Sequence, residues 1–140
     1  MGGRLMVAAK LVQLYMATAI LFFAIDILWL GVVAKRFYNR HLGHFFRERV
    51  NWTAAFIFYA LYILGILVFA LLPGIDGGSF ARTVMLGVLY GLFTYATYDL
   101  TNLATLKDWP VKIVVVDIIW GSVLCGLVSA GGFLLATCIL

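Results

Sequence analysis

Hydrophobic residues run in four long stretches that are separated by short polar segments. The stretches cover residues 11–33, 52–72, 83–106 and 113–138. Each is longer than the roughly 20 apolar residues that an α-helix needs to cross the core of a bilayer. None shows the alternating apolar and polar positions of a transmembrane β-strand. The pattern therefore predicts an all-α integral membrane bundle of four antiparallel transmembrane helices, with residues 1–140 as a single transmembrane domain.

The composition agrees with a membrane protein. Hydrophobic residues make up 65% of the chain and charged residues 11%, against roughly 45–50% and 25% in soluble domains. These values exclude a soluble globular domain, and they exclude a disordered chain because disorder requires low hydrophobicity. The ten Lys and Arg residues outnumber the six acidic ones. They lie at the ends of apolar stretches, where they meet lipid headgroups, so no nucleic-acid partner is expected.

Positive charge is distributed unevenly between the two sides of the predicted bundle. Seven of the ten Lys and Arg residues fall in the loops 34–51 and 107–112, and three fall beside the N-terminus and in the 73–82 loop. The positive-inside rule places the two basic loops in the cytoplasm and both termini outside. Trp52 and Trp109 lie at the ends of spans, as residues of an aromatic interfacial belt do.

The loop 34–51 predicts a short amphipathic helix in the membrane interface between the first two spans. Its apolar side chains gather on one side, and its basic side chains mostly avoid that side, as in helices that lie on anionic lipid. The predicted contacts of an anionic phospholipid headgroup are Lys35, Arg36, Arg40, Arg47 and Arg49. His41, His44 and Glu48 share one helical face and form a weak candidate metal site, which the cationic neighbourhood opposes.

Three of the spans each carry one carboxylate, at Asp26, Asp99 and Asp117. An ionised Asp at the centre of a bilayer costs roughly 3 kcal/mol, so such residues are usually functional. Counted along a helix from the ends of their spans, the first two lie about 10 Å and the third about 6 Å below the same surface. We therefore expect all three in one leaflet, which the charge distribution makes the cytoplasmic one.

Polar and aromatic residues accompany these carboxylates. Asp26-x-x-Trp29 and Asp117-x-x-Trp120 place a tryptophan on the helix face of each Asp, and an indole N–H can donate to a carboxylate in its own helix or across the bundle. The third span also has a G-x-x-x-G motif at Gly87 and Gly91, which permits close helix approach. The candidate intramembrane polar site comprises Asp26, Trp29, Tyr95, Tyr98, Asp99, Asn102, Asp117 and Trp120.

Three functions remain open from these residues. The first is a structural polar network that joins the helices. The second is a site that binds or transports a proton, a cation or a small polar solute, with a pathway between the protomers of a homo-oligomer. The third is a lipid-associated accessory or lipid-modifying protein that binds anionic phospholipid. No cofactor is predicted and an enzyme is not supported, because phosphate-binding loops, nucleophile–histidine pairs and histidines within the spans are all missing from the sequence.

Several longer strings resemble a bacterial family called "domain of unknown function 2177". They include Asp26-x-x-Trp29-Leu30-Gly31 and Leu42-Gly43-His44, the segment 95–110, and Asp117-Ile-x-Trp120-Gly121. The resemblance runs from about residue 11 to residue 135. It implies a small bacterial protein with four spans in the inner (cytoplasmic) membrane, and it points to the same residues without assigning them an activity.

Overall fold

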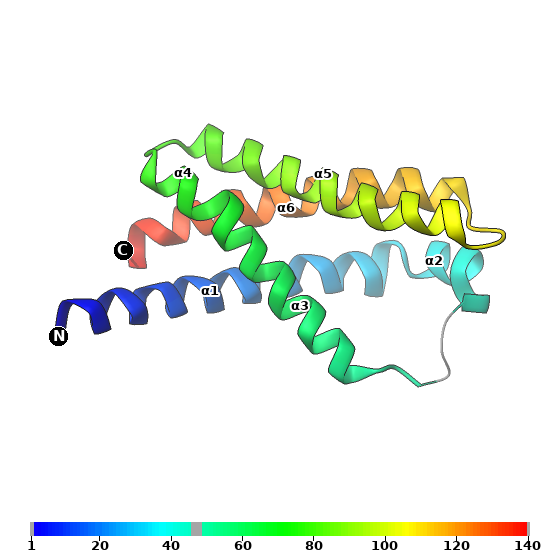
Figure 1. Cartoon of the computed structure of the whole chain (residues 1–140), viewed down its shortest axis with the longest axis horizontal. Coiled ribbons are helices and arrows are strands. Elements are labelled where there is room, and N and C mark those ends of the chain that lie inside the picture. The colour runs from blue at the N-terminus through cyan, green and yellow to red at the C-terminus, as the bar shows by residue number, and fades with distance from the viewer. Residues whose placement is uncertain (1, 46–48, 140) are drawn as a thin grey trace.

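The structure is a computed structural model that describes residues 2–45 and 49–139. These residues form helices and short connections, with no strand among them (Figure 1). The longer helices are α1 (Gly2–Leu28), α3 (Trp52–Ile66), α5 (Phe80–Thr105) and α6 (Val111–Ile139). The shorter elements are η1 (Trp29–Val33), α2 (Lys35–Leu42), η2 (Gly43–Phe45), η3 (Leu67–Leu71) and α4 (Leu72–Asp76). The predicted all-α class is confirmed.

Three helical stretches are long and apolar enough to cross a membrane. They run over Leu5–Val33, Trp52–Asp76 and Val111–Ile139, so that α1 continues through η1 and α3 continues through η3 into α4. With 26 residues, α5 is also long enough. It carries eight hydroxyl side chains from Thr83 to Thr105 together with Asp99 and Asn102, and it is not among the three stretches. The fourth span therefore stays a prediction.

The helices α5 and α6 form the closest pair in the molecule. They lie side by side along their lengths, with α6 running back along α5 after a short turn, and α1 lies beside α6 (Figure 1). By contrast α3 crosses the other helices obliquely, and its Trp52 end diverges from them (Figure 1). The axes are thus less uniformly aligned than the predicted antiparallel bundle.

Glycines explain how closely α5 approaches α6. A Cβ atom on Gly87 would collide with the Ser129 side chain and the Cys125 carbonyl, and one on Gly91 would collide with the Gly121 carbonyl. Only a residue without a side chain lets two helices meet backbone to backbone in this way. This close contact brings the Asp99 end of α5 beside the start of α6.

Apolar side chains fill the interior and also cover the outer faces. Leu14, Phe22 and Leu124 are among the fully buried residues of the main core. On the outside, Ile20 and Phe56 are 68% and 80% exposed. Extended apolar surfaces of this kind mark a membrane interaction site when they cover whole helices, so the outer faces suit lipid.

The predicted amphipathic helix is present as α2, and it folds against the start of α6. Its apolar residues Phe37, Tyr38 and Leu42 pack with Trp109 and with Ile113 and Val114 of α6. The basic side chains Lys35, Arg36, Arg40 and Arg49 are exposed to solvent, whereas Arg47 and Glu48 lie outside the described residues. The apolar face of α2 therefore contacts protein in addition to any lipid.

Candidate functional site

Three aspartates from three helices are buried at the α2 end of the molecule. Asp26 of α1 is 5% exposed, Asp99 of α5 is 0% exposed and Asp117 of α6 is 8% exposed. Tyr95 of α5 lies within electrostatic range of both Asp26 and Asp117, and Asp99 lies within range of Asp117. The structure thus brings the three carboxylates into one polar region.

The two tryptophans of the D-x-x-W strings stack on each other. The Trp29 and Trp120 rings are nearly parallel, at 9°, with centroids 4.2 Å apart. Trp120 lies beside Asp26, the carboxylate of the other string, although its N–H has no hydrogen bond of normal geometry. Trp29 reaches the Asp117 carboxylate through an intermediate side chain, Tyr38. Each tryptophan therefore lies near the carboxylate of the other helix, although neither indole N–H makes a direct hydrogen bond to a carboxylate.

Tyr38 of α2 is the link to Asp117. Its hydroxyl donates to Asp117 Oδ1 and accepts from Trp29 Nε1 at 3.4 Å. Burial and then the Asp117 carboxylate raise the pKa of Tyr38 above the ordinary value near 10. The phenol therefore stays protonated and remains a donor. Tyr38 was not among the predicted site residues, because its partner Asp117 lies in another helix far along the sequence.

Asp26 is held from the α3 side. The Tyr59 hydroxyl donates to Asp26 Oδ2 at 3.5 Å, and the Tyr59 ring packs edge-on against Phe23 at 5.0 Å. This tyrosine escaped the sequence analysis because its span carries no charge that marks a polar face. These contacts join α3 to α1 close to Asp26.

Asp99 is the carboxylate without a hydrogen bond. Neither of its oxygens has a partner, and Asn102 Nδ2 and Trp109 Nε1 are also buried without partners. Trp109 lies beside Asp99 and is 8% exposed, so its ring is buried within the protein, and its place in an interfacial belt stays a prediction. It is buried because the turn between α5 and α6 folds it under α2. Unsatisfied buried groups are rare in folded proteins and call for an explanation.

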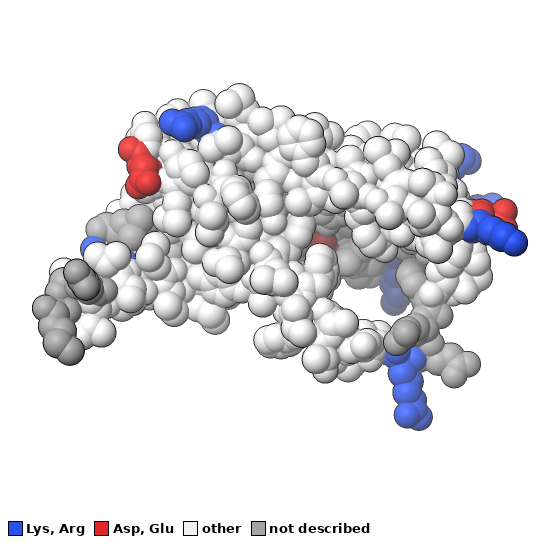
Figure 2. Space-filling view, in the orientation of Figure 1, with Lys and Arg blue, Asp and Glu red and all other residues white. Residues whose placement is uncertain are grey.

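A cavity of about 480 Å³ opens beside Asp117, whereas Asp26 and Asp99 do not line it. Figure 2 shows the molecule hollowed between α3 and the α5–α6 pair, with acidic atoms at the back of the hollow. The lining side chains are Phe58, Tyr62, Thr94, Tyr95, Tyr98 and Asp117. Asp117 and the two predicted tyrosines thus reach one cavity, and Tyr98 is also 60% exposed. The remaining lining residues, Phe58, Tyr62 and Thr94, were not predicted, because α3 has no charged residue to mark a polar face and Thr94 is itself uncharged.

Hydroxyl groups form the far wall of this cavity. The Tyr62 hydroxyl lies 3.0 Å from Thr94 Oγ1 and 3.1 Å from Cys125 Sγ. Further along α5, the hydroxyls of Thr97 and Thr101 donate to carbonyls of their own helix and face outward. The polar character of α5 is therefore divided between the cavity and its own backbone.

Comparison with known families agrees with these features. A family model described as predicted membrane protein, DUF2177, matches residues 11–134. The chain belongs to this family. No curated protein matches it, and no solved structure does. The DUF2177 chain is therefore a membrane protein with several candidate transmembrane helices, and its function has to be argued from the site itself.

The candidate metal residues of the DUF2177 chain do not converge in its described part. His41 Nδ1 is 2.9 Å from the Phe37 carbonyl, and the exposed His44 ring packs on Phe45. Glu48 lies outside the described residues. Among those residues, no three His, Cys, Asp or Glu side chains are placed to hold a metal ion together.

Proposed function

We propose that the protein binds a small organic cation in the cavity that Asp117 lines, with Asp26 and Asp99 adding negative charge from behind its walls. The observation that carries this proposal is that three buried carboxylates share one region without a basic neighbour among the described residues. Their neighbours are the tyrosines and tryptophans named above. Uncompensated negative charge is costly in a medium of low dielectric constant, so the region requires a proton or a cation.

The walls of the cavity favour an organic cation. Tyrosine and phenylalanine rings from α3 and α5 line it, and aromatic faces attract ammonium groups within about 6 Å of their centres. Its volume of about 480 Å³ lies within the roughly 300–1,000 Å³ of small-molecule sites. The Tyr62 and Thr94 hydroxyls in the lining suit a ligand that also carries a hydroxyl group.

The proposal includes α5 as a fourth membrane span. Its outer face carries exposed apolar residues, among them Phe93 and Leu100, whereas Asp99 is turned inward. Short connections to α4 and α6 then make the spans antiparallel. With the basic segments in the cytoplasm of a bacterium, the cavity lies in the cytoplasmic leaflet of the inner membrane. Transport would use a pathway between protomers of a homo-oligomer, since one protomer encloses little volume.

The test is the thermal stability of the purified protein in detergent with different cations. We would compare wild type with Asp99→Asn and Asp117→Asn, and use the exposed Asp76→Asn as the matched control. The ligands are a hydroxylated quaternary ammonium, its neutral carbon analogue, and sodium and potassium ions. At a hundredfold excess over its Kd, a ligand that binds only the folded state adds about 2.7 kcal/mol to stability.

We expect the ammonium compound, but not its neutral analogue, to raise the midpoint of wild type and of Asp76→Asn. Asp99→Asn should fold and lose that gain. If no cation stabilises the wild type, and the two buried variants simply melt at lower temperature, the carboxylates form an internal polar network and the proposal fails.

A further inference from the structure

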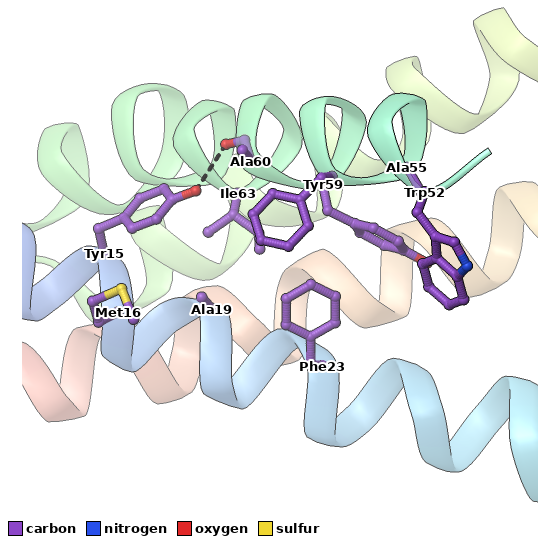
Figure 3. A pocket seen from close by; sticks show the side chains of 10 residues that line it. Tyr15, Met16, Ala19, Phe23, Trp52, Ala55, Tyr59, Ala60 and Ile63 are labelled. Carbon is purple, nitrogen blue, oxygen red and sulfur yellow. Dashed lines mark hydrogen bonds between the residues drawn. The ribbon is translucent and has the colours of Figure 1, made fainter. Parts of the chain in front are cut away.

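A second hollow lies between α1 and α3, on a different side of α3 from the carboxylate cavity. It measures about 410 Å³ and is lined by side chains within residues 15–23 of α1 and 52–63 of α3. Figure 3 shows Phe23 and Tyr59 on opposite walls, where their rings contact each other with centroids 5.0 Å apart, and small alanine side chains along both walls. Its lining is almost entirely apolar, so water and polar solutes are unsuitable occupants.

The two ends of this groove differ. At one end the Tyr15 hydroxyl donates to the Ala60 carbonyl at 3.0 Å, which joins α1 to α3 (Figure 3). At the other end stands Trp52, 75% exposed, where α3 diverges from the other helices (Figure 1). The groove is therefore closed toward Tyr15 and open toward Trp52.

Its length corresponds to one leaflet of a bilayer. From Trp52 to Ile63, α3 rises about 16 Å, which is half of the roughly 30 Å hydrocarbon core. Both walls belong to candidate membrane-spanning helices, so the groove faces hydrocarbon. A second helix, with a diameter of about 10 Å, cannot pass the point where the Tyr15–Ala60 hydrogen bond joins the walls. A single acyl chain fits this length and this closed end.

The open end carries features that suit an anionic headgroup. Arg49 is exposed and lies just before Asn51, which caps α3 by accepting from the Ala54 N–H at 3.1 Å. The remaining N–H groups of the first turn and the helix dipole favour a phosphate there. We propose that an anionic phospholipid binds in this groove, with one acyl chain between α1 and α3 and its phosphate at Arg49. This site does not depend on cation binding in the other cavity.

The experiment is photolabelling of the full chain in phosphatidylcholine vesicles that contain a small fraction of phosphatidylglycerol with a diazirine in its acyl chain. Labelled peptides are then located by mass spectrometry. We expect label to concentrate on the groove walls, at residues such as Met16 and Ala55, in preference to other exposed faces such as that of Ile119. A phosphatidylcholine probe with the same chain should label the groove more weakly, and Arg49→Gln should remove the difference.

Neighbouring alanines provide a matched pair of variants. Ala55→Trp fills the groove, whereas Ala54→Trp adds the same side chain at an exposed position outside the lining. We expect the first to lower groove labelling about tenfold, equivalent to about 1.4 kcal/mol, and the second to leave it unchanged. Ala19→Leu, which narrows the groove from α1, should repeat the loss if Ala55→Trp does not fold.

Three results would overturn the proposal. They are label spread evenly over all lipid-facing surfaces, equal loss in Ala54→Trp and Ala55→Trp, and equal labelling of the groove by the phosphatidylglycerol and phosphatidylcholine probes. The ammonium-dependent stability described above is measured separately in the same variants. Its failure would leave the groove result standing, and a failure of the groove would leave the cation site standing.

Discussion

Replacing Tyr38 by Phe tests the link between α2 and the buried carboxylates. The substitution removes one hydroxyl, which donates to Asp117 and accepts from Trp29. Asp117 is 8% exposed, so its carboxylate would lose its donor in a place that water scarcely reaches. A buried group left unsatisfied costs about 1–3 kcal/mol, and more if it is charged. We therefore expect Tyr38→Phe to lower the free energy of unfolding by at least about 1 kcal/mol.

The matched control is Tyr98→Phe. Tyr98 is 60% exposed, so loss of its hydroxyl should change stability by less than about 0.5 kcal/mol. Unfolding would be followed in mixed micelles by far-UV circular dichroism, and the Trp29–Trp120 stack would be followed by near-UV circular dichroism. Tyr38→Phe should weaken the near-UV signal before unfolding because Trp29 loses its acceptor. Equal stability of Tyr38→Phe and Tyr98→Phe would refute this account of the site.

Three further predictions concern helix packing, pH and the indole stack. Gly91→Ala forces a side chain against the Gly121 carbonyl and should lower the free energy of unfolding by about 1–3 kcal/mol. Gly43 has open space around it, so Gly43→Ala should not change the free energy of unfolding measurably. Similar unfolding curves for the two variants would contradict the close α5–α6 contact. Burial and Asp117 raise the pKa of Tyr38 in the folded state, so the contribution of Tyr38 to stability is complete below the unfolded value near 10 and is lost as pH rises through the folded pKa. The difference in stability between wild type and Tyr38→Phe should therefore disappear only above about pH 10. A difference that disappears at neutral pH would show that another group is responsible. Trp120→Phe should abolish the exciton signal of the stacked indoles and cost about 0.5–1.5 kcal/mol; an unchanged near-UV spectrum would exclude the stack in solution.

The helices and the buried carboxylates could be predicted because each is a local property of the chain. A long apolar run is sufficient to predict a helix, and counting along the runs predicts that Asp26, Asp99 and Asp117 lie toward the same end of the molecule. The partners of these residues could not be predicted. Tyr38 and Asp117 are 79 residues apart, and nothing in the spacing of either segment shows that α2 folds back onto α6.

The turn between α5 and α6 shows the same limit on a smaller scale. Asp108 adopts a positive φ of 59°, which a non-glycine residue seldom does, and this conformation lets the chain reverse within a few residues. Trp109 then points inward beside Asp99 instead of outward to the interface. The position of Trp109 at the end of a span predicted a residue at the membrane surface, but the local backbone conformation turns its side chain toward Asp99.

The exchange of partners between the two D-x-x-W strings has a consequence for how the chain is made. Asp26 lies in α1 and therefore leaves the ribosome well before Trp120, which lies in α6. During synthesis α1 therefore meets the membrane before Trp120, the indole neighbour of Asp26, has been made. The carboxylate region can therefore close only after α6 has been made, and a chain truncated before α6 should be retained by the insertion machinery or degraded.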